Sequence, residues 1–499
     1  MNGLEQHLPA LQVVVPMLVA PLVILLRPRG LAWAACTAAS VLAFAIAIQI
    51  TSTVLSTGPI SYAMGSWPAP YGIELRIDTL SALLLLVVTG ASALTLASGR
   101  QSLDASIEAE RQPLFFAAWL LALAGLAGIV VAGDAFNIFV FMEISSLASY
   151  VLIAGGPDRR ALPAVFKYLI MGTIGATFYL IGIGLIYMMT GTLNLADMEF
   201  RIHEVADQRP ILAAAGFITV GLALKAAIFP LHTWLPNAYT YAPHAVTAFL
   251  AACSTKVSLY VLLRFDFFVF QGNLAGHAFQ FAVYLMPLAL LAILVGSSVA
   301  MFEKNLKRLL AFSSVAQIGY MMLGASLVTI AGLSAGIIHI FNHALAKGAL
   351  FLAVAALAMV APSLRIDDLK GIARQMPWTS AALVVAGLSL IGVPGTAGFV
   401  SKWSLISAAM ELGAIGLPLV AVILISSLMA VVYIWRIVEA AYFGAAAGDE
   451  PPTPRRPVSP ALVTIVWVVA LANIYFGLAP DLPLTLARDA AEELLRHLP

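Results

Sequence analysis

The sequence predicts an all-α polytopic membrane protein with about 14 transmembrane helices, two inverted five-helix repeats and two broken helices. Of its 499 residues, 61% are hydrophobic and only 10% are charged, whereas a soluble domain is usually about 25% charged. Apolar segments of about 20 residues recur along the whole chain, and each is long enough to cross a hydrocarbon core of about 30 Å. Prolines interrupt two of these segments, at Pro230 and Pro394, and such a pair of breaks is typical of inverted-repeat transporters.

The predicted spans follow one another closely and leave no room for a soluble domain of useful size. They cover roughly residues 8–26, 31–54, 78–98, 113–132, 135–154, 163–190, 211–229, 244–264, 279–302, 307–327, 331–360, 379–408, 415–443 and 460–480.

The distribution of basic residues predicts the orientation in a cell membrane. Alternate loops hold most of them: Arg27, Arg29, Arg100, Arg111, Arg159, Arg160, Lys304, Lys307, Arg308, Arg365, Lys370, Arg374, Arg455 and Arg456. By the positive-inside rule these loops are cytoplasmic, which places the N-terminus and the C-terminus outside. The first apolar stretch has no basic residue before it, so we interpret it as a span and not as a cleavable signal peptide.

The two breaks lie in segments that we assign to two repeats. Proline removes a backbone donor and kinks a helix, which a membrane tolerates only where the freed groups face protein or water. Lys225 and Lys402, near the two breaks, lie 177 residues apart. We therefore expect N-terminal helices over 1–112, a first repeat over 113–264, a second repeat over 279–443, and a final helix and tail over 460–499.

Glu143, Lys225 and Lys256 are charged residues that lie well inside predicted spans. A charge at the bilayer centre costs roughly 2.5–3.5 kcal/mol on insertion scales, so each requires a partner or a function. We interpret Glu143 and Lys225 as a pair that controls the protonation of the lysine, because burial favours the neutral amine and a nearby carboxylate favours the ammonium. Two alternatives stay open: a structural ion pair that fixes helix packing, and lysines that snorkel to the membrane surface.

His339, His343 and Lys347 are spaced four residues apart in one span and therefore share a helical face. A polar stripe on an apolar helix must face the bundle interior or water. Two histidines at this spacing can bind zinc, but no third ligand accompanies them, so we expect no metal site. We interpret the stripe as a proton relay that ends at Lys402.

Two further residues are weaker candidates for the same path. His244, at the start of the eighth span, either passes protons or simply begins a helix beside an aqueous vestibule. Arg436 lies three residues before Glu439, so it either pairs with that carboxylate or stands at the exit of the path.

Several functional classes are not indicated by the sequence. The net charge of +1 gives no reason to expect nucleic-acid binding, and the only cysteines, Cys36 and Cys253, form no metal or disulfide pattern. The chain has no GxGxxG after a strand, no P-loop, no CxxC set and no haem pattern. We therefore expect no cofactor and no electron transfer within this chain, and a transporter subunit more than an enzyme.

With these residues in place, the chain resembles the antiporter-like membrane subunits shared by respiratory complex I, membrane hydrogenases and the multisubunit Na⁺/H⁺ (Mrp-type) antiporters. The resemblance covers about residues 60–445 and is most specific in the segment LKAAIFPLHTWLPNAYTYAPHAVTAFLAACSTK. It continues in KRLLAFSSVAQIGYM at 307–321 and HIFNHALAKGALFL at 339–352. The stretch GDAFNIFVFMEISSLASYVLI looks most like the D-type subunit of the Mrp antiporter, and the lysine at position 402 agrees with that.

The resemblance implies a fold, a site and a set of partners. The fold has two inverted five-helix repeats with a half-channel in each, and the protein works beside other integral membrane subunits. The implied substrates are H⁺ and Na⁺. The implied proton path consists of Glu143, Lys225, Lys256, His339 or His343, and Lys402. Two other functions stay open: the proton-pumping membrane subunit of an NADH:quinone oxidoreductase or hydrogenase, and a stand-alone carrier.

Overall fold

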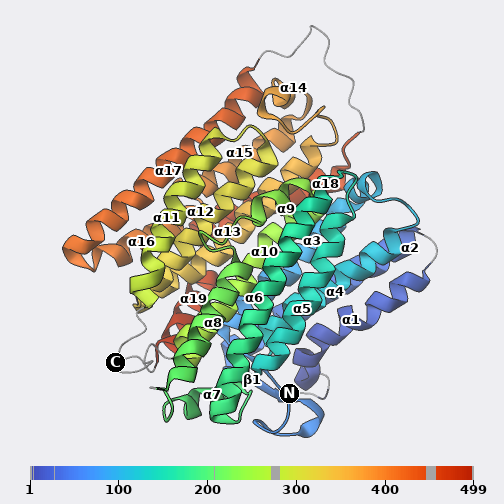
Figure 1. Cartoon of the computed structure of the whole chain (residues 1–499). Coiled ribbons are helices and arrows are strands. Elements are labelled where there is room, and N and C mark those ends of the chain that lie inside the picture. Colours follow the sequence, from blue (N-terminus) through green and yellow to red (C-terminus); the bar gives the residue numbers. More distant parts are fainter. Residues whose placement is uncertain are drawn as a thin grey trace.

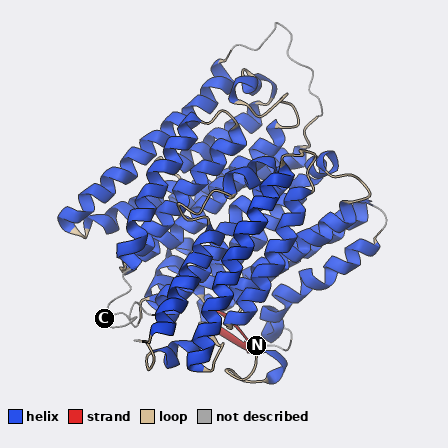
Figure 2. Cartoon of the chain, in the orientation of Figure 1, coloured by secondary structure: helices blue, strands red, loops and turns tan. Residues whose placement is uncertain are grey.

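The computed structural model describes residues 3, 5–26, 29–206, 208–270, 281–444 and 457–496. Over these residues the chain is almost entirely helical, and the long helices run side by side in one bundle (Figure 1, Figure 2). In the described part, thirteen helices are long and apolar enough to cross a membrane. The all-α polytopic class that the sequence predicts is therefore confirmed.

Nineteen α-helices follow one another along the described chain. Those before residue 270 are α1 (Leu8–Leu25), α2 (Arg29–Thr57), α3 (Thr79–Ser106), α4 (Gln112–Val131), α5 (Ala135–Ala154), α6 (Ala161–Thr190), α7 (Leu195–Ile202), α8 (Arg209–Ala226), α9 (Leu235–Tyr241) and α10 (His244–Leu263). Those after residue 280 are α11 (Phe281–Phe302), α12 (Leu306–Ser326), α13 (Ile330–Leu357), α14 (Ile372–Gln375), α15 (Pro377–Ile391), α16 (Ala397–Met410), α17 (Gly416–Val438), α18 (Pro460–Leu478) and α19 (Asp481–Leu494).

The short elements lie at the helix ends. Strands β1 (Ile60–Ala63) and β2 (Glu74–Ile77) form an antiparallel hairpin with Ile60 opposite Ile77. The remaining short helices are η1 (Glu5–His7), η2 (Met64–Ser66), η3 (Arg264–Val269), η5 (Ile366–Leu369), η6 (Gly413–Ile415) and η7 (Glu439–Phe443); η3 and η7 have π-helical geometry.

Side-chain caps explain where several long helices begin. The first turns of α3, α5, α12 and α13 donate backbone N–H groups to Asp78, Asp134, Asn305 and Thr329 respectively. Short polar side chains of this kind satisfy the amides that have no partner inside the helix. Asp134, which lies next to a predicted span, is therefore a helix cap.

Each predicted span overlaps one of these helices, except for 379–408. That span consists of α15 and α16, which are separated by residues 392–396, and neither half is long enough alone to cross a membrane. Helix α8 ends at Ala226, three residues before the approximate end of the predicted span 211–229. Ala227 adopts a left-handed backbone conformation with φ of 56°, which ends the helix three residues before Pro230.

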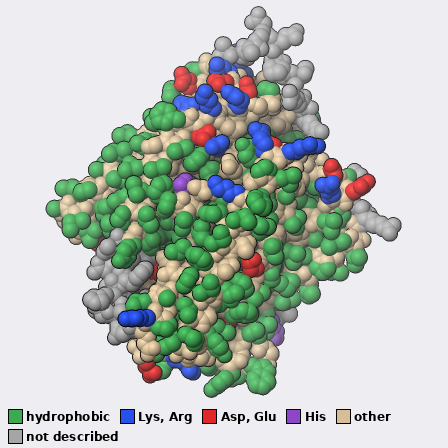
Figure 3. Space-filling model, in the orientation of Figure 1, with side chains coloured by type: hydrophobic (Ala, Val, Ile, Leu, Met, Phe, Trp, Pro, Cys, Tyr) green, Lys and Arg blue, Asp and Glu red, His purple; other side chains and the backbone are tan. Residues whose placement is uncertain are grey.

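The two ends of the bundle differ in character. One end, which we call the terminal face, carries the N-terminus, β1, α7 and α19 (Figure 1). At the opposite end, near α14, most of the visible lysine and arginine side chains gather (Figure 3); we call this end the basic face. Arg27, Arg455 and Arg456, which the sequence analysis also placed in this set, lie outside the described residues.

The flanks of the bundle are apolar. On α17, Leu417, Leu424, Leu428 and Trp435 are each more than half exposed, and green hydrophobic side chains cover most of the side view in Figure 3. Exposed apolar surface of this extent suits lipid tails or neighbouring subunits and not water.

Candidate proton-transfer site

The Glu143–Lys225 pair that the sequence predicts is present. The Lys225 Nζ atom on α8 lies 3.3 Å from Glu143 Oε1 on α5 and donates to Ser146 Oγ at 2.7 Å. The Lys225 side chain is 4% exposed and that of Glu143 is 28% exposed. The lysine is therefore buried with one carboxylate beside it, and a hydroxyl supplies a second, neutral partner.

The end of α8 determines where Lys225 stands. The helix ends one residue after Lys225, and Trp234 Nε1 donates at 2.9 Å to the Leu224 carbonyl, which also accepts from the Ala227 N–H at 3.3 Å where the helix breaks. On the other side α6 packs so closely that there is no room for a side chain at Gly221. A Cβ there would lie 2.5 Å from the Gly175 carbonyl oxygen. The lysine therefore occupies the last turn of a helix that its neighbours hold tightly.

Lys256 lies in the middle of the molecule on α10 and is only 1% exposed. Its Nζ atom donates to the Ala251 carbonyl on the same helix. In the described part of the chain no hydrogen bond or ion pair joins Lys256 to Lys225, so the two amino groups do not contact each other directly. Helix α10 packs against both α8, which carries Lys225, and α13, which carries His343.

The polar stripe of α13 is buried along its whole length. His339, His343 and Lys347 are 4%, 3% and 0% exposed, and the two imidazole rings are nearly parallel with their centroids 6.2 Å apart. His339 Nδ1 lies 2.8 Å from Ser401 Oγ, and its Nε2 lies 2.8 Å from Gln317 Oε1. Because the Gln317 oxygen can only accept, Nε2 carries a proton, and in the neutral ring Nδ1 accepts from Ser401.

The other two residues of the stripe are held differently. Neither ring nitrogen of His343 has a hydrogen-bond partner among the described residues. A buried imidazole without partners is costly in a structural role, because an unsatisfied buried polar group costs about 1–3 kcal/mol. Lys347 Nζ, by contrast, donates to the Leu310 carbonyl and to Ser313 Oγ, both at 2.6 Å.

The second break positions Lys402 on α16. Its Nζ atom donates to the Leu390 and Ile391 carbonyls at 3.1 and 2.8 Å, which α15 leaves free where it ends. Gly392 makes this possible, because it has a φ of 91° and a Cβ there would lie 2.8 Å from Lys402 Cδ. Lys225 lies before the break that ends α8, whereas Lys402 lies after the break between α15 and α16. The two lysines therefore do not occupy equivalent positions relative to their breaks, although each lies beside the end of a helix.

Several residues of the site were not predicted. Ser146 contacts Lys225, Gln317 and Ser401 hold His339, and Ser427 Oγ accepts from Lys402 Nζ at 3.1 Å. The Tyr320 ring lies between the two basic groups of the second half, with its centroid 5.5 Å from that of His339 and 4.9 Å from Lys402 Nζ. Neutral serine, glutamine and tyrosine residues are common in apolar helices, so only tertiary contacts identify them.

His244 lines a polar vestibule at the basic face. A hollow of about 510 Å³ opens there between the loops, and its wall includes Asp158, Arg160, Lys304, Lys307 and Arg365. Hydrogen bonds from Arg160 hold the pKa of the Asp158 carboxyl below its usual value. Lys307 Nζ donates to the Ala242 carbonyl at 2.7 Å. The structure thus places His244 beside water-accessible space, at the start of α10.

Arg436, the weakest of the predicted candidates, contacts another helix end. Its guanidinium donates to the carbonyls of Met301 and Glu303, where α11 ends. A cation at a helix C-terminus is favourable because it satisfies free carbonyls and complements the helix dipole. The described residues contain no hydrogen bond or ion pair between Arg436 and Glu439.

A bundle of apolar helices with carboxylate, amine and imidazole groups buried across its interior defines a class of membrane protein whose internal ionisable side chains serve ion movement. More particularly, the chain belongs to the NADH:quinone oxidoreductase/Mrp antiporter transmembrane family, whose model matches residues 132–430. It is an antiporter-like, multi-pass membrane subunit of the superfamily that contains complex I and the Mrp antiporters, as the resemblance predicted.

Two relatives of the chain carry different names within this family. The chain is 42% identical over 440 residues to the NADH-quinone oxidoreductase subunit N of Desulforudis audaxviator, an alignment that covers 87% of this chain and 86% of the relative. It is 28% identical over 459 residues to the D-type subunit of the Na⁺/H⁺ antiporter of Bacillus subtilis, an alignment that covers 92% of this chain and 91% of the relative.

Solved structures of large membrane complexes contain chains of the same shape. A chain of the Mrp complex from Dietzia sp. DQ12-45-1b matches with a TM-score of 0.88 at 28% identity, over 99% of this chain and 98% of that chain. A chain of the membrane-bound sulfane sulfur reductase, an archaeal respiratory membrane complex, matches with a TM-score of 0.89 at 31% identity, over 98% of each chain. A chain of respiratory complex I from Thermus thermophilus matches with a TM-score of 0.74 at 27% identity, over 96% of this chain and 99% of that chain.

Proposed function

We propose that this chain is the proton-translocating subunit of a multisubunit monovalent cation (Na⁺)/H⁺ antiporter in the cell membrane. The observation that carries the proposal is the series of buried ionisable side chains on successive packed helices: Glu143 on α5, Lys225 on α8, Lys256 on α10, His343 and His339 on α13, and Lys402 on α16. A structural role explains one buried ion pair, but it does not explain further amines and imidazoles that have no carboxylate partner among the described residues.

The chemistry of these groups fits proton transfer. Each lysine exchanges between an ammonium and an amine, and the neutral partners around Lys256 and Lys402 make either form tolerable. His343, with both ring nitrogens free of described partners, accepts a proton from Lys256 and passes it to His339. Transfers between groups that are not in contact use a water molecule or a side-chain rotation.

The resemblance of the stretch GDAFNIFVFMEISSLASYVLI to the D-type antiporter subunit, and the lysine at position 402, support the antiporter function over the redox one. The TM-scores alone do not separate the two functions, since they are 0.88 for the Mrp complex, 0.89 for the archaeal respiratory complex and 0.74 for complex I. The solved relatives named above belong to membrane complexes, and the exposed apolar flank of α17 offers a surface for a neighbouring subunit. In this proposal the basic face is cytoplasmic, the His244 vestibule gives cytoplasmic protons access, and α4–α10 and α11–α17 are the two repeats.

The proposed orientation predicts opposite labelling of two engineered cysteines. Ser56 lies in the last turn of α2 at the terminal face, and Ser459 precedes α18 at the basic face. In a chain whose two native cysteines are replaced, a membrane-impermeant maleimide added outside is expected to label Ser56→Cys and not Ser459→Cys. Labelling of both positions from the same side contradicts the fourteen-crossing topology.

The test of the proposed function uses the purified complex in sealed proteoliposomes that contain a pH-sensitive dye. A Na⁺ pulse without NADH or any other reductant is expected to move protons in the opposite direction. Lys225→Ala in the same complex is the matched control and is expected to abolish the signal. Proton movement that needs a reductant and a quinone instead refutes the antiporter assignment.

One observation favours a second function. The 42% identity with the NADH-quinone oxidoreductase subunit N is higher than the 28% identity with the D-type antiporter subunit. The alternative is therefore a proton-pumping membrane subunit of a complex I-like enzyme, which would use the same buried side chains with no electron carrier in this chain. The reductant-dependent outcome of the liposome experiment supports this alternative.

A further inference from the structure

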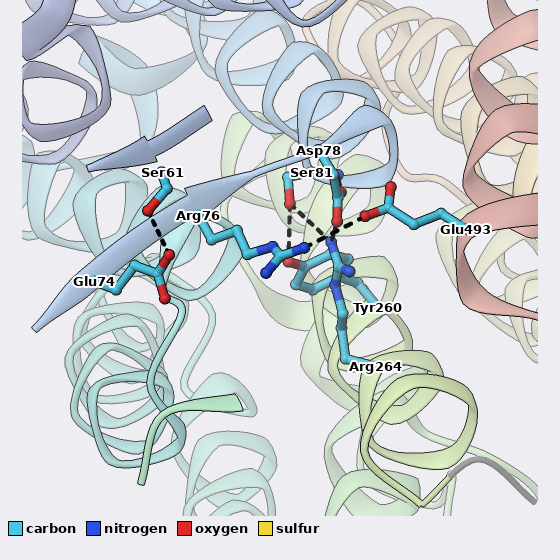
Figure 4. Close-up of polar contacts among 8 residues, drawn as sticks. All are labelled: Ser61, Glu74, Arg76, Asp78, Ser81, Tyr260, Arg264 and Glu493. Atoms are coloured by element: carbon cyan, nitrogen blue, oxygen red, sulfur yellow. Dashed lines mark hydrogen bonds and ion pairs between the residues drawn. The ribbon is translucent and has the colours of Figure 1, made fainter. Parts of the chain in front are cut away.

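A second group of polar side chains lies at the terminal face, outside the path described above (Figure 4). Arg76 belongs to β2, Asp78 precedes α3, Arg264 begins η3 and Glu493 lies in the last turn of α19. Asp78 and Arg264 are 1% and 7% exposed, whereas Arg76 and Glu493 are 34% and 23% exposed. The group therefore extends from the interior of the bundle to its surface.

Hydroxyl groups connect the inner end of this group. Tyr260 OH lies 3.0 Å from Ser81 Oγ and donates to the Val130 carbonyl at 2.9 Å. Arg264 Nη2 donates to Ser81 Oγ at 3.2 Å and also to Asp78 Oδ2. Tyr260, Ser81 and Asp78 thus meet around one guanidinium, and two of them carry hydroxyls that can both accept and donate.

Helix α10 links this group to Lys256. Lys256, Tyr260 and Arg264 are spaced four residues apart, so they follow one another along one face of the helix. At 1.5 Å per residue, Tyr260 lies about 6 Å beyond Lys256 toward the terminal face, and Arg264 about 12 Å beyond it. Lys256 Nζ donates to the Ala251 carbonyl, on the side of Lys256 away from Tyr260, so the lysine side chain has to rotate toward Tyr260, with water completing the connection.

The charges at the outer end favour protons over metal cations. Two guanidinium groups and two carboxylates balance one another, with Arg76 Nη2 3.8 Å from Glu493 Oε1. A sodium ion requires several oxygen ligands and is repelled by the arginines, whereas a proton needs only a chain of hydroxyl and carboxyl groups.

The two carboxyl groups have different environments. Burial alone would raise the pKa of Asp78, but the attraction and hydrogen bond of Arg264 hold that pKa below its usual value. Burial, with the negative charge of Asp78 adding to it, raises the pKa of Glu493. Asp78 thus remains the charged partner of Arg264, and Glu493 is the carboxyl that takes up a proton more readily.

From this arrangement we infer that Tyr260, Ser81 and Glu493, with the Asp78–Arg264 pair holding them in place, form a proton connection between Lys256 and the terminal face. This connection rests on the proposed proton-translocating function and gives the first repeat its own route to that side of the membrane. In the outward direction the Lys256 ammonium gives up one proton and becomes an amine. Tyr260 and then Ser81 each accept one proton and release one, while Asp78 stays a carboxylate that holds Arg264. Water carries the proton from Ser81 to the Glu493 carboxylate, which then releases it at the terminal face.

The decisive variant is Tyr260→Phe, which removes one hydroxyl and keeps the ring. In the reconstituted complex we expect its Na⁺-driven proton flux to fall at least about tenfold, in line with the usual contribution of a positioned proton-transfer group. The matched control is Tyr179→Phe, because Tyr179 is also buried and also donates to a backbone carbonyl, that of Ala135 at 2.9 Å, but lies on α6. We expect the control to retain a flux within about twofold of the parent.

Glu493→Gln provides a second measurement that does not disturb the buried tyrosine. It is expected to lower the flux and to remove its dependence on the pH at the terminal face. Glu492→Gln is the control, since Glu492 lies next to it but pairs with Arg488 on the surface at 2.9 Å. Assembly and thermal stability of each complex are measured alongside.

The outcomes separate this connection from a purely structural role and from the proposed function itself. A network that only docks α19 predicts normal flux in a stable Tyr260→Phe complex, and lower stability without a change in pH dependence in Glu493→Gln; these results overturn the inference. If Lys225→Ala abolishes flux while Tyr260→Phe and Glu493→Gln do not, the proposed function stands and the connection is refuted. If the parent complex moves no protons, the proposed function itself fails.

Discussion

Replacing Lys225 with alanine is expected to abolish proton transport while the subunit still assembles into its complex. In the proposed function the Lys225 ammonium is the group on α8 that receives and releases the proton, and a methyl group cannot replace it. Loss of a positioned proton-transfer group typically costs about 10²–10⁴ in rate, so we expect a decrease of at least about 100-fold. Flux in proteoliposomes measures the rate, and co-purification of the partner subunits measures assembly.

Lys167→Ala is the matched control for this substitution. Lys167 lies on α6, another membrane-crossing helix, but its side chain is exposed at the flank of the bundle. It is the kind of lysine that snorkels toward the membrane surface and carries no buried proton. Its replacement by alanine is expected to leave transport close to that of the parent.

In the proposed path Glu143 controls how tightly Lys225 holds its proton. Its carboxylate, 3.3 Å from Nζ, favours the ammonium, whereas burial favours the amine. Glu143→Ala is therefore expected to impair transport nearly as much as Lys225→Ala. Glu143→Asp retains the charge but withdraws it by one methylene and is expected to keep partial activity.

A purely structural ion pair predicts a different pattern. Removing one partner leaves an uncompensated buried charge, which typically costs about 3–5 kcal/mol, so each single variant would fail to assemble. The double variant Glu143→Ala/Lys225→Ala removes both charges and would then regain assembly and transport. Recovery of transport in the double variant would refute the role of Lys225 in the proton path.

The charged part of the site was predictable because charges stand out in apolar helices. Glu143, Lys225, Lys256 and Lys402 each interrupt a run of hydrophobic residues, and the insertion cost of a charge makes such interruptions informative without a structure. The residues that hold them, such as Ser146, gave no such signal, because a serine in a membrane helix satisfies its own hydroxyl by bonding to a backbone carbonyl of the preceding turn.

The parts of the fold that the sequence left unpredicted are the short and amphipathic ones. Helix α19 lies in what the sequence analysis assigned to a tail, yet its Leu486, Ala487, Ala490 and Leu494 are buried against the bundle. Its apolar face is narrow and its hydropathy is low, so a search for long apolar segments does not detect it. The short η3 turn was not predicted either, and its Arg264 pairs with Asp78 from a distant part of the chain, a contact that the sequence alone does not indicate.

Replacing Lys402 with arginine is expected to stop transport as completely as replacing it with alanine. Both lysine and arginine carry a positive charge, but a guanidinium does not lose its proton in a protein. Arginine can donate to the same acceptors, the carbonyls of Leu390 and Ile391 and the hydroxyl of Ser427. If Lys402 must release a proton, arginine preserves the contacts and still blocks the step, with a loss of at least about 100-fold in flux.

A structural cation at the break between α15 and α16 predicts the opposite result for Lys402. In that case Lys402→Ala would destabilise the complex, and Lys402→Arg would restore both its thermal stability and its flux. Ser404→Ala is the control on the same helix, because its hydroxyl bonds only to the Val400 carbonyl at 2.8 Å in the described structure and takes no part in the path. Normal flux in an assembled Lys402→Arg complex would exclude Lys402 as a proton carrier, since the charge alone would then suffice.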